Sequence, residues 1–217
     1  MKRISSLLHV VMFFPAAIGV AMVVRRSLAI GGIATGSPPF PGAAGFDADF
    51  SRHPFITFLH ILPGALFMLL APLQFLPRIR NGYPRWHRSS GLVVIVCGYI
   101  IGISALFMPF FLHPIGGLNE SVATSFFAVY FLIALSMAWR AIRRRDIVRH
   151  RQWMIRMFSI GVAVGTIRPI VVLFFVFSGL PPQMFFGTAF WLGFSLHLVL
   201  AEWYIGYSKF TLHEVGN

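Results

Sequence analysis

The sequence predicts an all-α fold, a polytopic membrane helical bundle with six transmembrane helices. Hydrophobic residues make up 57% of the 217 residues and charged residues only 11%, whereas a soluble domain carries about a quarter charged residues. Several apolar runs approach the length of about 20 residues that crosses a bilayer as a helix. The net charge of +12 falls mainly at the ends of these runs, so it indicates membrane topology and not a nucleic-acid partner.

Apolar windows of about 20 residues define the helices in chain order. A Gly- and Pro-rich segment separates the first helix from the others, and Gly and Pro also mark the later breaks. We therefore expect a single integral membrane domain over residues 1–217, with an anchor helix (6–24), an outer loop (25–54) and a five-helix core (55–207). The six expected spans are residues 6–24, 55–77, 89–112, 121–141, 153–178 and 183–207.

Basic residues assign the two sides of the predicted bundle. Fourteen of the 18 Lys and Arg residues fall on one side, so the positive-inside rule places both termini in the cytoplasm. We expect a multi-pass protein of the bacterial cytoplasmic membrane, in which Arg143-Arg144-Arg145 fixes topology and binds anionic lipid headgroups. We interpret the first helix as an uncleaved anchor and the loop after it as a flexible tether, with a lid folded over the outer face as the alternative.

An internal repeat is the most informative pattern. His87-Arg88 is followed after nine residues by a Gly-x-x-x-Gly pair, and His150-Arg151 is followed after nine residues by another. Helices 2–3 and 4–5 thus form a parallel repeat, which predicts a pseudo-two-fold axis along the membrane normal and places the two histidines at equivalent depths near the cytoplasmic boundary. The glycines serve either close helix packing or the approach of a flat cofactor to the backbone.

Polar side chains recur inside the expected spans. An arginine in hydrocarbon costs at least about 2.5 kcal/mol on insertion scales, so Arg168 must face protein, water or an anionic ligand. It either caps backbone carbonyls near Pro169 or clamps a carboxylate or a haem propionate. His60 and Gln74 share one face of the second helix, and His197 lies on an inward face of the last one.

Histidine is the residue type that suggests chemistry here. Neutral imidazole binds iron, copper or zinc, shuttles protons, or simply joins helices by hydrogen bonds. His87 and His150 are the candidate metal ligands, whereas His113 lies in a loop and is set aside with the other boundary histidines. The lone Cys97 provides neither a disulfide framework nor a cysteine zinc site. The candidate cofactor-binding residues are His87, His150, His60, His197, Arg168 and Gln74.

Several short motifs carry a family resemblance. At these motifs the chain resembles a family of uncharacterised predicted bacterial membrane proteins of the domain of unknown function 2306 type, over the second to fifth helices. The resemblance supports the fold and the choice of site residues and implies no reaction. A weaker, general likeness is to b561-type membrane cytochromes, which hold two haems between helices by paired histidines. The motifs are His60-x-x-x-Gly64, Gln74-Phe75, Arg80, His87-Arg88-x-x-Gly91, His150-Arg151-x-Trp153-Met154-x-Arg156 and Arg168.

Three hypotheses of function follow. The first is a redox protein or redox-complex subunit in which His87 and His150 ligate haem b or a metal, while Arg168 and His60 shape an outer pocket for a quinone. The second is a proton-coupled small-solute transporter with His60, Arg168 and His197 along its pathway. The third is a structural or assembly subunit whose polar residues only join helices.

Overall fold

A computed structural model describes the backbone of residues 2–33 and 43–215 and the side chains of residues 9–33 and 48–208. Regular structure in these ranges is helical, and six helices are long and apolar enough to cross a membrane. The predicted six-span, all-α fold is therefore confirmed. The long helices are α1 (Lys2–Ile30), α3 (Pro54–Gln74), α5 (Pro84–Phe111), α6 (Gly117–Arg143), α7 (Ile147–Phe177) and α8 (Pro182–Val215), and the short ones are α2 (Ala43–Arg52) and α4 (Pro77–Gly82).

Several helices begin earlier than the hydrophobic windows predict. α5 begins at Pro84 and not at residue 89, because proline suits the first helical position, where its missing N–H has no helical partner. α7 begins at Ile147 and not at residue 153, because the Asp146 carboxylate caps it by accepting the Arg149 N–H at 2.9 Å. His87 and His150, which lie outside the predicted spans, therefore belong to the first turns of α5 and α7.

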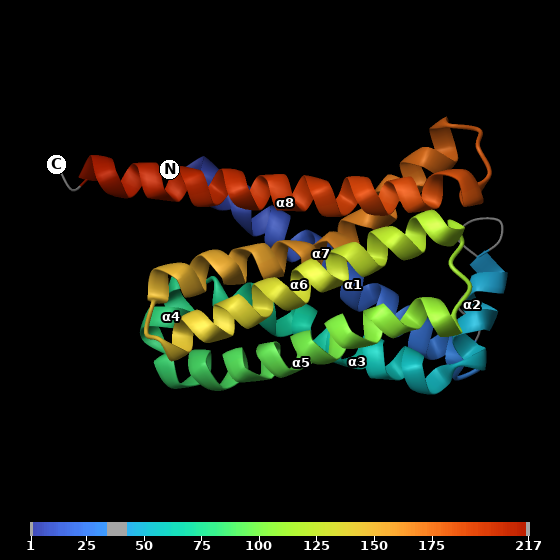
Figure 1. Ribbon diagram of the computed structural model, residues 1–217, viewed down its shortest axis with the longest axis horizontal. Coiled ribbons are helices and arrows are strands. Elements are labelled where there is room, and N and C mark those ends of the chain that lie inside the picture. The colour runs from blue at the N-terminus through green and yellow to red at the C-terminus, as the bar shows by residue number, and fades with distance from the viewer. Residues whose placement is uncertain (1, 34–42, 216–217) are drawn as a thin grey trace.

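Five of the long helices enclose the interior of the bundle. α3 packs against α1 and α5, α5 packs also against α6, α6 against α7, and α7 against α1. α8 contacts α7 and α6 from outside this ring. Figure 1 shows α2 and α4 at opposite ends of the bundle, which we call the α2 end and the α4 end. The predicted topology makes the α4 end cytoplasmic, and this orientation stays a prediction.

The glycine pairs of the repeat serve close packing. A Cβ added to Gly102 would lie 2.5 Å from the side chain of Leu132 on α6, and one added to Gly161 would lie 2.6 Å from that of Phe67 on α3. A Cβ on Gly165 would collide with the backbone carbonyl of Pro15 on α1. Small residues let these helices approach closely, and the same three glycines also line a cavity within the bundle.

The predicted repeat corresponds to the helix pairs α3–α5 and α6–α7. The members of each pair pack against each other. α1 contacts both α3 and α7, whereas α5 and α6 contact each other directly. The first helix thus takes part in the core on one side of the bundle only, and the pseudo-two-fold relation stays a prediction.

Part of the outer loop folds onto the bundle. We expected a flexible tether, which is wrong for residues 43–52, because these form α2 and pack against α1 and α3. Phe50 is buried, and its backbone carbonyl accepts a hydrogen bond from the Thr57 hydroxyl at 3.1 Å. Residues 34–42 of the same loop lie outside the described residues.

Candidate functional site

A cavity of about 270 Å³ lies within the bundle, toward the α2 end. All six long helices contribute to its wall, and Phe50 reaches it from α2. Most of the wall is apolar, with a few convergent polar groups, which is the usual composition of a small-molecule site. The polar and charged residues that line it include Arg26, His60, His113, Glu120 and Arg168.

Arg168 is the charged group placed deepest along the wall. It lies nine residues before the end of α7 at Phe177, a distance of about 14 Å along the helix axis. The predicted capping of backbone carbonyls near Pro169 is not observed, because the structure gives the guanidinium no hydrogen bond or ion pair with any described residue. Its charge instead acts across the cavity, attracted by Glu120 and repelled by Arg25.

Glu120 supplies the negative charge of the cavity wall. It is buried in the first turn of α6, where a carboxylate interacts favourably with the helix dipole. One of its oxygens accepts the Gly116 N–H at 2.9 Å, which holds the carboxylate at the helix start. Glu120 therefore balances Arg168 over a distance and does not form a direct ion pair with it.

His60 lines the cavity from α3, as its inward position in the sequence predicts. Its Nδ1 lies 2.9 Å from Ser104 Oγ. The Ser104 hydroxyl donates its only hydrogen to the carbonyl of Ile100 at 2.6 Å, so the histidine must donate Nδ1–H to the serine oxygen. This tautomer leaves the His60 Nε2 lone pair as a hydrogen-bond acceptor.

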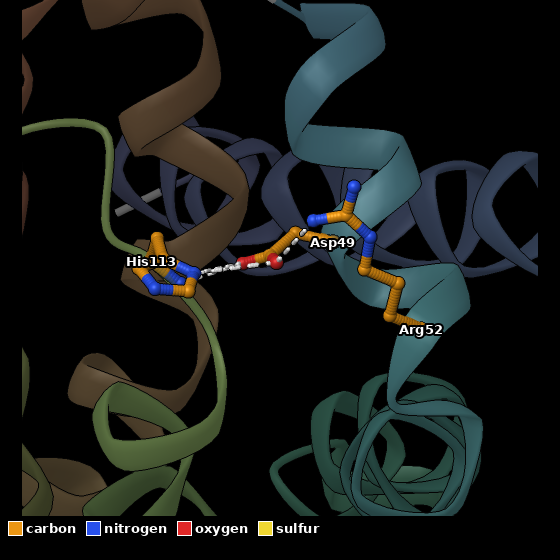
Figure 2. Close-up of polar contacts among 3 residues, drawn as sticks. All are labelled: Asp49, Arg52 and His113. Carbon is orange, nitrogen blue, oxygen red and sulfur yellow. Dashed lines mark hydrogen bonds and ion pairs between the residues drawn. The ribbon is translucent and has the colours of Figure 1, made fainter.

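The α2 end of the cavity is held by a cluster that sequence reasoning missed. Asp49 accepts the His113 backbone N–H at 2.6 Å, and both of its oxygens lie 3.3 Å from the His113 ring Nδ1. Figure 2 shows this contact between α2 and the connection after α5, with Arg52 on the other side of the carboxylate, 4.0 Å away. The Arg26 guanidinium lies over the Phe50 ring at 4.0 Å from its centroid, a favourable cation–π arrangement.

The ionisation of Asp49 follows from these contacts. Burial alone would raise the pKa of the Asp49 carboxyl, but the hydrogen bonds from the His113 backbone and ring and the charges of His113 and Arg52 hold that pKa below its ordinary value. Asp49 is therefore ionised at neutral pH and joins α2 to His113 as a carboxylate.

His87 and His150 occupy the α4 end. The two rings lie within electrostatic range of each other, and Arg80 also acts on His87. His87 Nδ1 is buried and has no hydrogen-bond partner among the described residues, an uncommon state for a buried polar atom. His150 Nδ1 lies 3.0 Å from the Ala138 carbonyl, so it donates N–H and its Nε2 keeps the lone pair. The described residues contain no group of three or more metal-ligating side chains.

Two of the candidate residues join helices away from the cavity. The Gln74 side-chain amide donates to Ser90 Oγ at 2.9 Å and so links α3 to α5. His197 is buried, and its Nε2 lies 2.8 Å from the Thr166 hydroxyl between α8 and α7. The six candidates thus form three pairs. One pair lines the cavity, one lies at the α4 end, and one joins helices by hydrogen bonds; these pairs are His60 and Arg168, His87 and His150, and Gln74 and His197.

An ion pair at the interface of α7 and α8 was also missed from the sequence. Arg156 Nη2 donates to Glu202 Oε2 at 2.8 Å, and its Nε donates to the other carboxylate oxygen, a bidentate arrangement. The guanidinium also stacks over Trp153 at 4.7 Å. Arg156 therefore has a partner within the protein, Glu202 on α8.

The remaining missed residues are those at the α2 end. The predicted bounds place Arg26 and Asp49 in the outer loop, His113 in a later loop and Glu120 just before a span. These residues converge because α1, α2 and α5 end beside the cavity and α6 begins there, which their spacing in the sequence does not reveal. The one sequence feature that could have indicated this cluster is Glu120, a carboxylate in the first turn of an apolar helix.

The fold and the cavity define a polytopic helical membrane protein with a mainly apolar cavity, which a few polar groups line, inside its bundle. A family model described as "Predicted membrane protein (DUF2306)" matches residues 57–205, and the chain belongs to this family. The matched region holds the six candidate residues and leaves out α1 and α2. No curated protein and no solved structure matches the chain, so the likeness to b561-type cytochromes stays a prediction.

Proposed function

We propose that the protein binds a small amphipathic molecule inside the membrane, in the cavity around Arg168, and acts as its carrier. The observation that supports this most is the Arg168 guanidinium. Arg168 belongs to a membrane-spanning helix and lines the cavity, and it has no ion pair with a described residue. An arginine at this depth is costly unless a partner or water solvates it. A bound ligand supplies that partner.

The proposed ligand has a polar group and an apolar body. Arg168 provides hydrogen-bond donors on the cavity wall, and His60 lines the same wall. Aromatic and aliphatic residues, among them Phe67, Phe127 and Phe131, form the remaining wall, so an apolar body gains by leaving water.

The predicted topology gives this proposal a direction. With both termini in the cytoplasm of a bacterial cell, the α2 end faces outward, and the ligand enters from the outer side of the cytoplasmic membrane. The basic residues at the α4 end, Arg143 to Arg145 among them, then lie beside anionic lipid headgroups.

Recovery of the bound molecule tests the proposal. Protein purified in mild detergent is extracted with organic solvent, and the extract is compared by mass spectrometry among the wild type, Arg168→Ala and Arg151→Ala. Arg151 is an exposed α4-end residue with one hydrogen bond, to Tyr204, and serves as the matched control. We expect the same compound from the wild type and the control and at least tenfold less from Arg168→Ala. Equal recovery from all three contradicts the proposal.

A second candidate is a redox role at the α4 end. It is favoured by the unpartnered His87 Nδ1 and by the His150 tautomer, whose Nδ1–H bond to a carbonyl is typical of ligating histidines. In this proposal the two histidines bind haem b or a metal ion, and a quinone or redox partner exchanges electrons with it.

An absorption spectrum tests the redox candidate. Protein expressed with ample haem is reduced with dithionite, and the candidate predicts the bands of six-coordinate haem, lost in both His87→Ala and His150→Ala and retained in His197→Ala. For a metal ion the same comparison is made by elemental analysis. If the wild type shows no haem bands and holds no stoichiometric metal, the redox candidate is eliminated. The carrier proposal is unaffected by that result.

A further inference from the structure

If the cavity binds a ligand, as proposed above, the charges on its wall indicate the chemical class of that ligand. We propose that the ligand is a singly charged amphipathic anion, a carboxylate on an apolar chain, whose head group lies beside Arg168 and whose chain extends toward the middle of the bundle.

The charge of Arg168 favours an anionic ligand. Among the described residues Arg168 has no ion pair, and Glu120, the acidic residue among the described lining residues, acts on it through its charge alone. A single carboxylate provides Arg168 with an ion pair, whereas a cation beside the guanidinium is repelled by it.

The planar guanidinium of Arg168 suits a carboxylate, which it binds through two parallel hydrogen bonds. Glu120 leaves this role open, because it accepts the Gly116 N–H at the start of α6 and acts on Arg168 through its charge alone. A ligand carboxylate provides the direct contact.

The polarity of the cavity changes along its length. The charged side chains gather toward the α2 end, whereas Phe67 and Phe131 pack edge to face at 5.9 Å between their ring centroids in the apolar core. The cavity volume of about 270 Å³ lies near the lower end of the range for small-molecule pockets, about 300 Å³. A medium-length chain with one polar end fits this gradient.

Binding of matched amphiphiles distinguishes the possible charges. Full-length protein in nanodiscs of zwitterionic lipid is titrated with decanoate, decanol and decyltrimethylammonium, and binding is measured by calorimetry. Each probe partitions into the lipid to the same extent whichever variant the nanodisc holds, so differences between variants report on the protein. For the comparison between probes, the heat measured with protein-free nanodiscs is subtracted for each probe. We expect the wild type to bind decanoate at least tenfold more tightly than either of the other probes.

Two substitutions assign the preference to the cavity. Arg168→Gln should weaken decanoate binding at least tenfold and leave decanol binding within twofold. Glu120→Gln keeps an oxygen for the Gly116 N–H and removes the competing charge, so it should strengthen decanoate binding about fivefold. Arg151→Gln is the control and should bind like the wild type.

The outcomes separate this inference from the proposed function. Decanol bound as tightly as decanoate, or weaker decanoate binding in Glu120→Gln, overturns the anion inference while the cavity remains a ligand site. Tighter binding of the cation overturns it as well. No binding of any probe, together with equal recovery of small molecules from the wild type and Arg168→Ala, overturns both.

Discussion

At the scale of single residues, the described polar groups fall into two kinds. Gln74 and His197 have partners on neighbouring helices, and they hold the bundle together as interhelical hydrogen bonds do in membranes. Arg168 lines the cavity without such a partner among the described residues, and His60 lines it while its Nδ1 bonds Ser104 on α5. The distinction depends on the partner of each side chain, which residue type and spacing do not reveal.

Asp49 carries a prediction at this scale. Its carboxylate joins α2 to His113, so Asp49→Asn should lower the free energy of unfolding by about 1.5 kcal/mol at pH 7. This is the lower end of the range for hydrogen bonds to a charged group, chosen because the His113 ring is exposed. The folded-state pKa of Asp49 lies below its ordinary value of 3.8, so this contribution is present above that value and is lost as the pH falls through the folded-state pKa.

Thermal unfolding of the wild type and Asp49→Asn in the same detergent, followed from pH 7 to pH 3, checks this expectation. The stability difference should be constant near neutrality and shrink below about pH 4. Arg52→Gln is the control, because Arg52 is exposed and contacts the carboxylate only at 4.0 Å. A difference that persists unchanged at pH 3 would show that the carboxylate charge does not join α2 to His113.

At the scale of elements, apolar length predicted the long helices, because a helix satisfies all backbone hydrogen bonds of such a segment within a bilayer. Their ends were less predictable, since the Asp146 cap extends α7, and Pro84 at the first helical position extends α5, into polar sequence. α2 was not predictable as a packed helix, because contacts distant in the sequence, such as Thr57 to Phe50 and Asp49 to His113, hold it in place. Glycine spacing indicated close packing, but only the structure identifies Leu132, Phe67 and Pro15 as the partners.

At the scale of the whole molecule, the ring of α1, α3, α5, α6 and α7 explains why the site could be predicted only in part. Arg168 and His60 stand out in the sequence because polar residues are costly within a span. The other half of the charged wall, Arg26 and Glu120, lies near helix ends where such residues are ordinary, and it becomes part of a site only when the helices close around the cavity.

The central claim is that the cavity around Arg168 binds an amphipathic anion. A crystal structure of the full chain with 10-bromodecanoate, with data collected at the bromine edge, tests it most directly. We predict a carboxylate within hydrogen-bonding distance of the Arg168 guanidinium and a single anomalous peak among Phe67, Phe127 and Phe131. Bromine peaks confined to the lipid-facing surface of the bundle, with no carboxylate at Arg168, would contradict the account.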